Sequence, residues 1–137
     1  MIAALIYVIS VAAFLQFFVS YCRSLIAASR RVELSERLRE ITGIADGIVP
    51  AEDFDRLLQL VHLCHERVDD GTKIRAVETY YTLLRPLNYI ARMLMPGAVA
   101  WVEREREGCS YFAAVALDRR ISLESDDHST QQPAGRL

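Results

Sequence analysis

The first apolar stretch of the chain runs from Ile2 to Tyr21 without a charged residue. A helix of about twenty residues extends about 30 Å, which matches the hydrocarbon core of a bilayer. A small soluble domain could not cover such a helix on all sides. The pattern therefore predicts a transmembrane anchor helix over residues 1–22.

A cleaved signal peptide is the main alternative for this segment. Signal peptides carry basic residues before the apolar run and small residues at the cleavage site. Here no Lys or Arg precedes the run, and the candidate cleavage site, around Ala27 and Ser29, lies beyond Arg23. These features favour an anchor over a signal peptide.

Basic residues follow the apolar run closely. Arg23, Arg30 and Arg31 lie just after it, while the other flank offers only the α-amino group. Positively charged flanks stay on the cytoplasmic side of a membrane. We therefore expect the N-terminus outside and the rest of the chain in the cytoplasm, with Tyr21 and the three arginines at the membrane interface.

The predicted span has two unlike faces. At about 100° per residue, one face gathers the aromatic residues Tyr7, Phe14, Phe17, Phe18 and Tyr21. The opposite face carries small and polar residues: Ala12, Ala13, Gln16 and Ser20. Small residues let helix backbones approach closely, and an amide within a membrane favours a hydrogen-bond partner over lipid. We expect this second face to contact another transmembrane helix; the alternative is that Gln16 and Ser20 reach interfacial water.

Residues 23–49 are predicted to form a juxtamembrane helix and a glycine-containing linker. Apolar residues recur there at spacings of four and three, as in an amphipathic helix: Leu34, Leu38 and Ile41. Gly43 and Gly47 interrupt this pattern, because glycine weakens a helix and is common just past its end. The helix is therefore expected over residues 32–41.

Residues 50–121 are expected to form a helical domain. Its first helix begins at Pro50, where two acidic residues follow and complement the helix N-terminus. Apolar residues at helical spacing continue to about Asp69. The Asp70-Gly71 pair is typical of a turn, and a second helix should follow it.

Two prolines divide the rest of this domain. Pro86 should end or kink its helix, because it lacks an amide proton and clashes with the preceding turn. After Pro96 and Gly97, a last helix should run to about Ile121. Residues 122–137 are mostly polar, which predicts a disordered tail. The expected fold is all-α: one transmembrane helix, a bundle of three to four amphipathic helices, and this tail.

The stretch from Leu87 to Val102 is rather apolar for its place in a small domain. It is too short to span a membrane, and it contains Arg92 and two helix breakers. We expect it to pack in the core. The alternative is an interfacial element with Trp101 at the level of the lipid headgroups.

Charge argues against a nucleic-acid partner. The 137-residue chain has a net charge of -2, with acidic and basic residues mixed along its length. A nucleic-acid binder needs a basic stripe to collect phosphates. The alternating run from Glu103 to Glu107 is expected to be a solvated helix face rather than a site.

One local cluster of metal-ligand side chains is present: His62, Cys64 and His65. The two histidines would project about 60° apart on a helix, but Cys64 points away from His62. A zinc site needs three or four converging ligands. We therefore expect structural roles and no bound cofactor, with a small metal or redox protein as an alternative. Cys22, at the membrane edge, is compatible with acylation.

Catalytic motifs are not recognisable in this sequence. It contains no Gly-x-Ser-x-Gly, no phosphate-binding loop and no dinucleotide-binding glycine pattern. The expected function is a non-catalytic, single-span accessory or assembly subunit of a larger membrane protein complex. Its partners would be other membrane protein subunits and the lipid bilayer, and self-association is compatible with the same face. The alternative is a membrane-tethered helical scaffold that recruits a soluble protein.

Overall fold

The computed structural model describes residues 1–43, 49–64 and 68–130. Every regular element among them is helical, which confirms the predicted all-α fold. The elements are α1 (Ile2–Ser29), α2 (Glu36–Thr42), the 3-10 turn η1 (Ala51–Asp53), α3 (Phe54–Leu63), α4 (Val68–Leu94) and α5 (Pro96–Thr130).

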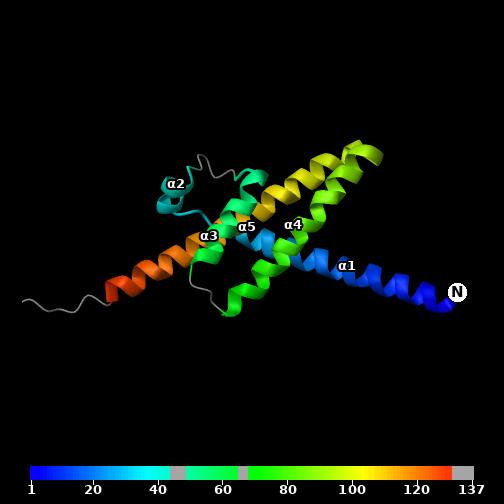
Figure 1. The fold of residues 1–137 in the computed structure, drawn as a ribbon, viewed down its shortest axis with the longest axis horizontal. Helices are drawn as coiled ribbons and strands as arrows, with labels where there is room; N and C mark the ends of the chain where they lie inside the picture. Colours follow the sequence, from blue (N-terminus) through cyan, green and yellow to red (C-terminus); the bar gives the residue numbers. More distant parts are fainter. Residues whose placement is uncertain (44–48, 65–67, 131–137) are drawn as a thin grey trace, which may run out of the picture.

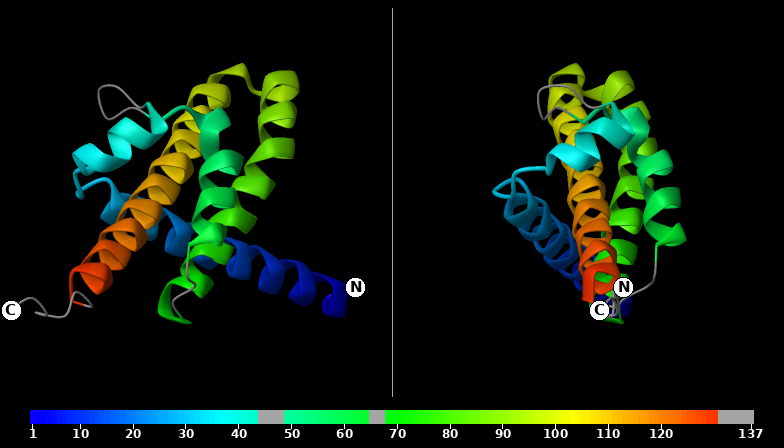
Figure 2. Two further views of the ribbon diagram at one scale, coloured as in Figure 1. Left: turned by 60° about the vertical axis from the view of Figure 1, so that its left-hand side comes forward. Right: turned by 90° about the vertical axis from the view of Figure 1, so that its left-hand side faces the viewer.

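Helices α4 and α5 form a long antiparallel hairpin, and the other elements pack around α5 (Figure 1). The right-hand view of Figure 2 places α1 and α3 on opposite sides of α5. Helix α2 lies against α5 near the C-terminal end of α1. Helix α5 is therefore the centre of the bundle.

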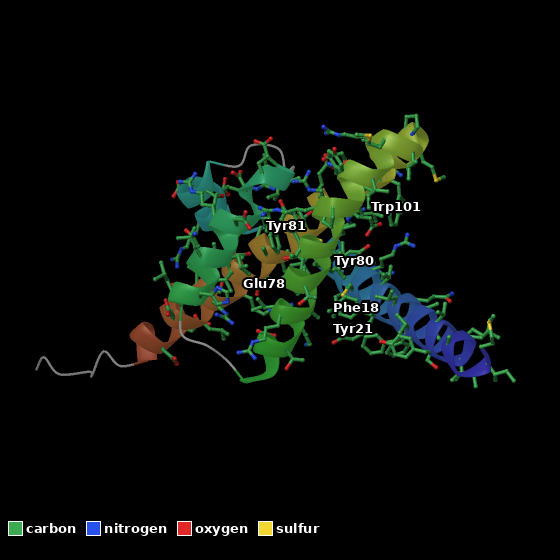
Figure 3. The ribbon with its side chains drawn as sticks, turned by 45° about the vertical axis from the view of Figure 1, so that its right-hand side comes forward. Phe18, Tyr21, Glu78, Tyr80, Tyr81 and Trp101 are labelled. Carbon is green, nitrogen blue, oxygen red and sulfur yellow. The ribbon has the colours of Figure 1, made fainter. Side chains whose placement is uncertain are left out.

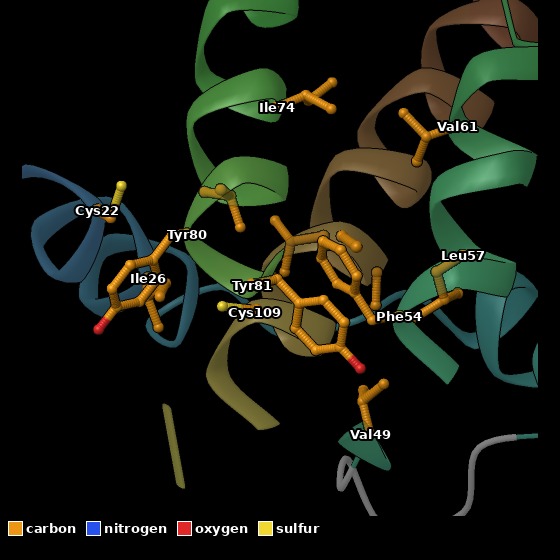
Figure 4. Packing of buried hydrophobic residues seen from close by; sticks show 14 of the residues in the cluster. Cys22, Ile26, Val49, Phe54, Leu57, Val61, Ile74, Tyr80, Tyr81 and Cys109 are labelled. Carbon is orange, nitrogen blue, oxygen red and sulfur yellow. The ribbon is translucent and has the colours of Figure 1, made fainter. Parts of the chain in front are cut away.

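The core forms where α3, α4 and α5 meet (Figure 4). The rings of Phe54 and Tyr81 stack with their centroids 4.0 Å apart. The Tyr81 hydroxyl donates a hydrogen bond to the Ala51 carbonyl (2.8 Å), and Arg106 donates one to that hydroxyl (3.2 Å). A buried tyrosine needs such a partner for its hydroxyl, so the core also fixes the start of α3.

The N-terminal helix divides into two halves with different surroundings. Residues 1–17 are exposed and extend away from the bundle (Figure 1). The second half enters the core, where Cys22 is 0% exposed and Ile26 is 3% exposed. One continuous helix therefore belongs to the bundle at one end and leaves it at the other.

Several boundaries differ from the sequence-based expectation. Helix α2 begins at Glu36 rather than at residue 32, because Asp118 of α5 binds the backbone amide (3.0 Å) and the hydroxyl of its N-cap, Ser35. The left-handed backbone of Gly43 (φ 67°) ends this helix, as predicted. Gly47 lies outside the described residues.

The expected helix from Pro50 to Asp69 is shorter than predicted. It begins as a 3-10 turn and ends at Leu63, and buried Arg120 donates a hydrogen bond (2.5 Å) to the Val61 carbonyl in its last turn. Asp70 and Gly71 do not form a separate turn, because α4 already begins at Val68. An aspartate in the first turn is favourable there, since it complements the helix dipole.

Helices α4 and α5 continue past the ends expected for them, and the kink expected at Pro86 stays a prediction. Helix α4 runs through Pro86, which is exposed, and Leu84 and Asn88 on either side of it are buried. Helix α5 continues to Thr130 instead of ending near Ile121, and Arg37 of α2 binds Ser125 in the extended part (3.0 Å). The break at Pro96 is confirmed, and residues 131–137 of the expected tail lie outside the described residues.

Candidate functional site

The exposed half of α1 is a continuous apolar surface. In its most apolar 18-residue window, no residue is buried. Large apolar side chains face outward all round it: Ile2, Leu5, Ile6, Tyr7, Val8, Ile9, Phe14 and Phe17. By length and composition this helix could cross a membrane, and an N-terminal signal sequence would satisfy the same criteria. A core helix of a soluble protein would be buried instead.

The buried half of α1 joins it firmly to the bundle. The Cys22 thiol lies 3.6 Å from the Ala76 carbonyl of α4, to which it donates a hydrogen bond. Ile26 packs against α5 close to Gly108. Because Cys22 is enclosed in this contact, an acyl chain on its sulfur would have to displace α4. The acylation considered from the sequence is therefore incompatible with this packing.

The predicted docking face of α1 lies on the exposed surface of the helix. Ala12, Ala13, Gln16 and Ser20 are all exposed. At about 100° per residue, Gln16 and Ser20 lie roughly 120° and 160° round the helix from Cys22, which faces α4. Gln16 and Ser20 therefore point away from the protein's own domain, where another helix could approach them.

Two of the arginines predicted for the membrane interface contact the bundle. Arg23 forms an ion pair with Glu105 (Nε to Oε1, 3.4 Å), and Arg30 donates a hydrogen bond to the Arg104 carbonyl (3.1 Å). Arg31 and Tyr21 are exposed. The boundary of the apolar segment therefore coincides with the start of its contact with the domain (Figure 3).

Glu105 connects this boundary to the interior of the hairpin. It accepts a hydrogen bond from the buried Tyr80 hydroxyl (3.1 Å) as well as pairing with Arg23. Burial raises the pKa of Tyr80 above its ordinary value, and the negative charge of Glu105 raises it further. The hydroxyl therefore stays protonated and keeps its donor role at physiological pH.

The charged run from Glu103 to Glu107 is not the fully solvated face expected from its sequence. Glu103, Glu105 and Arg106 are half-buried, and only Arg104 and Glu107 are exposed within this run. Glu103 binds the side chain of Asn88 (2.9 Å), and it pairs with Arg106 (3.3 Å) and Arg92 (3.8 Å). Asn88 and Arg92 come from α4, so sequence spacing along α5 identifies Arg106 as a partner but not these two.

The turn between α4 and α5 exposes a second apolar surface, which contradicts the expected core packing of residues 87–102. Only part of the stretch is buried, for example Ala91 and Val102. Large side chains at its outer side are exposed: Leu87, Tyr89, Ile90, Met93, Leu94 and Met95. Trp101 is 37% exposed on the same hairpin (Figure 3). The physical reason is that a hairpin end has no further element to cover it.

The possible metal cluster has no third ligand within the described part of the chain. His62 is exposed in the last turn of α3, and Cys64 is half-buried just past it. His65 lies outside the described residues. Among the residues that the structure describes, no group of three His, Cys, Asp or Glu side chains could hold a metal ion.

A cleft of about 190 Å³ lies where the end of α1 meets α4 and α5. Its wall includes Leu25 and Phe112, and Asp70, Lys73 and Arg119 carry its charges. Sites for small molecules are usually about 300–1,000 Å³. The cleft is therefore too small for most metabolites.

Comparison with known proteins adds no constraint to this geometry. No family model, curated protein or solved structure matches the chain.

Proposed function

We propose that the protein is a non-catalytic, single-span accessory or assembly subunit of a larger membrane protein complex. In this proposal α1 crosses the membrane and docks on another transmembrane helix, while the helical bundle covers a cytoplasmic surface of the complex. The observation that carries the proposal is the division of α1 into an apolar, exposed half and a half that is buried in the core.

This division favours an anchor over a cleaved signal sequence. A cleavage near Ala27 would remove Cys22 and Ile26 from the core, and both are almost completely buried. The loss of buried apolar side chains destabilises a small domain severely. Residues 1–29 are therefore better explained as a permanent part of the protein.

The continuity of α1, from the exposed half into the core, favours a subunit over a tethered scaffold. A tether gives its domain freedom through a flexible linker. Here the span enters the bundle as one unbroken helix, Ile2–Ser29, and the ion pair between Arg23 and Glu105 holds it at the boundary. The position of α1 in the membrane therefore fixes the position of the bundle, as a docked subunit requires.

The docking face supports a helical partner within the membrane. Ala12 and Ala13 permit a close approach of backbones, and Gln16 and Ser20 supply hydrogen-bonding groups. All four side chains are exposed, and Gln16 and Ser20 lie on the side of α1 that is turned away from the bundle. The arginines after the span support a cytoplasmic position for the bundle, because basic flanks favour the cytoplasmic side of a membrane.

The test is the native mass of the full chain, extracted from its own membranes in mild detergent. We expect a large particle with several different chains. The double substitution Gln16→Leu and Ser20→Leu should release the protein from it, because it removes the polar contacts and enlarges the small face. The matched control, Phe14→Leu with Phe17→Leu on the opposite side, should leave the particle intact.

Two results would contradict the proposal. Retention of the large particle by the Gln16→Leu and Ser20→Leu variant would show that this face does not dock. A lone wild-type chain that still captures a soluble protein would favour the tethered scaffold.

A further inference from the structure

We infer that the α4–α5 turn is a second membrane contact, which inserts into the interfacial region of the same bilayer that α1 crosses. The inference rests on the proposed insertion of α1 and adds a lipid-binding surface to it. We call this surface the hairpin tip and define it by its exposed apolar side chains: Leu87, Tyr89, Ile90, Met93, Leu94, Met95 and Trp101.

The composition of the hairpin tip suits a lipid interface. From residue 86 to residue 102, Arg92 is the one charged residue. A cluster of exposed apolar side chains of this kind marks a binding surface. Tyr89 and Trp101 are amphipathic rings of the kind enriched at membrane interfaces, and Arg92 can extend its guanidinium toward the headgroups.

The hairpin tip and the free half of α1 diverge from their crossing, as Figure 2 shows, but both extend from the bundle in the direction that is to the right in Figure 1. Figures 1 and 3 show both on the right, with Trp101 on the side of the hairpin toward α1. The two elements meet at the ion pair between Arg23 and Glu105. Beyond that point α1 continues to its apolar end, and α5 continues to Pro96.

The length of α5 sets how deeply the tip can reach. Pro96 precedes Glu105 by nine residues, which corresponds to about 14 Å of helix. Along the axis of α5, the tip therefore lies only about 14 Å beyond the residue that pairs with Arg23. Interfacial elements lie about 5–10 Å deep, so the geometry fits an interfacial contact and excludes a second span.

The contact between α1 and the bundle begins close to the end of the predicted span, which leaves little room for a soluble partner between the bundle and the membrane. Phe18 is already partly buried against the core, and Cys22 is fully buried. If residues 2–21 span the bilayer, the bundle lies directly on the membrane surface. Any part of it that extends further along the direction of α1 then meets lipid, and a soluble partner would have to displace that lipid.

The backbone of the turn is also compatible with insertion. Unpaired amides are costly in lipid. Met95 donates its amide to the Ala91 carbonyl (2.8 Å), and Ala98 donates its amide to the Met95 carbonyl (2.9 Å). Pro96, between them, has no amide proton to satisfy. Below the tip, Glu103 is paired with Arg92 and Arg106, which reduces the cost of bringing its charge near the membrane.

Trp101 is the single tryptophan of the chain, so its fluorescence reports on the tip alone. The full chain is reconstituted into vesicles of phosphatidylcholine and phosphatidylglycerol, with or without bromine atoms on the upper part of the acyl chains. Bromine quenches a tryptophan only at short range. We expect Trp101 to lose most of its fluorescence in the brominated vesicles.

A matched pair of variants tests whether the tip itself is responsible. Leu94 at the tip is 76% exposed, and Leu63 at the end of α3 is 82% exposed, so glutamate at either position leaves the core intact. Leu94→Glu should abolish most of the quenching, and Met93→Glu should repeat this effect. Leu63→Glu should be quenched as strongly as the wild type.

The inference is wrong if wild-type Trp101 is not quenched, or if Leu94→Glu and Leu63→Glu are quenched equally. Flotation with the vesicles distinguishes this failure from a failure of the anchor. With α1 inserted, all variants float with the vesicles, whether or not the tip contacts lipid. Wild-type protein that does not float would overturn both proposals.

The Gln16→Leu and Ser20→Leu variant should float and be quenched as the wild type is, because docking needs another subunit.

Discussion

Gly108 of α5 lies directly against Ile26 of α1. A Cβ atom at Gly108 would be only 2.7 Å from Ile26 Cγ2, and 2.9 Å from the Arg30 guanidinium. The absence of a side chain at Gly108 therefore permits the close crossing of α1 over α5. This crossing connects the apolar half of α1 to the rest of the domain.

The substitution Gly108→Ala should separate α1 from α5. Ile26 is β-branched and nearly fully buried, so it cannot easily rotate away from a new methyl group. Overpacking costs about 1–3 kcal/mol, and the better helix propensity of alanine offsets up to about 1 kcal/mol. We expect a net loss of about 1–2 kcal/mol in the free energy of unfolding, measured by urea denaturation in detergent micelles.

Gly97→Ala is the matched control for this substitution. Gly97 lies in the same helix, and a Cβ atom there would have no neighbour within 4 Å. The alanine should therefore leave the stability unchanged or raise it slightly. Equal stability of the two variants would show that the crossing is looser than the structure indicates.

The helical pattern of the sequence was sufficient to predict the class of fold. Apolar periodicity located α1 and the domain helices, and Gly43 and Pro96 marked two of their boundaries correctly. The start of α2 could not be predicted, because its N-cap contact comes from Asp118, 83 residues away along the chain. The same limit applies to Glu105, whose inward position depends on Arg23 and Tyr80.

The candidate surfaces were predictable to different degrees. Helical phase alone placed Gln16 and Ser20 on one face of α1. Whether that face meets the protein's own bundle depends on how α1 crosses α5, and Gly108 gave no recognisable signal for this crossing. The stretch around Met93 was expected in the core, because a buried helix and a lipid-facing helix have similar composition. Only the folded chain, in which the large side chains of this stretch are exposed, shows that they lie outside the core.

A fragment that begins at Pro50 should not fold as the full chain does. It would lack five residues that are buried in the core: Cys22, Ile26, Leu34, Leu38 and Val49. Burying a large aliphatic side chain contributes about 1.5–3 kcal/mol, and a whole domain is stable by only about 5–15 kcal/mol. Far-UV circular dichroism during heating should show no cooperative transition for this fragment.

A fragment that begins at residue 17 is the control for this truncation. It removes the exposed apolar half of α1 and keeps the buried residues, so it should melt cooperatively. A cooperative transition in the fragment from Pro50 would mean that α1 and α2 contribute little to the core.

The stability of the fold should decrease at alkaline pH. Burial raises the pKa of the Cys109 thiol from 9.0 to about 12, and nearby Glu105 adds to this shift. A thiol with a raised pKa in the folded state keeps its proton while the unfolded chain loses it. The contribution of Cys109 is therefore fully present below pH 9 and is lost progressively as the pH rises toward 12, by up to about 1.4 kcal/mol per pH unit.

Chemical denaturation between about pH 8 and pH 10 should measure this loss. The substitution Cys109→Ser removes one of the two buried thiols and should make the decrease shallower, even if it lowers stability at every pH. The other buried thiol, Cys22, and the Tyr80 hydroxyl, whose pKa is also raised, would account for the remaining slope. A variant with the slope of the wild type would exclude Cys109 as its source.

The three cysteines should react with a thiol reagent in two separate phases. Cys64 is partly exposed, whereas Cys22 and Cys109 are both 0% exposed, and all three are free thiols. The thiolate is the reactive form, and the raised pKa of Cys109 makes it scarce in the native state. Native protein in micelles should therefore label quickly at one cysteine, and denaturant should make the other two accessible to the reagent.

Cys64→Ser should remove the fast phase alone. Rapid labelling of Cys22 in the native state would show that α1 leaves the bundle, and the continuous anchor on which the proposed function depends would then be wrong.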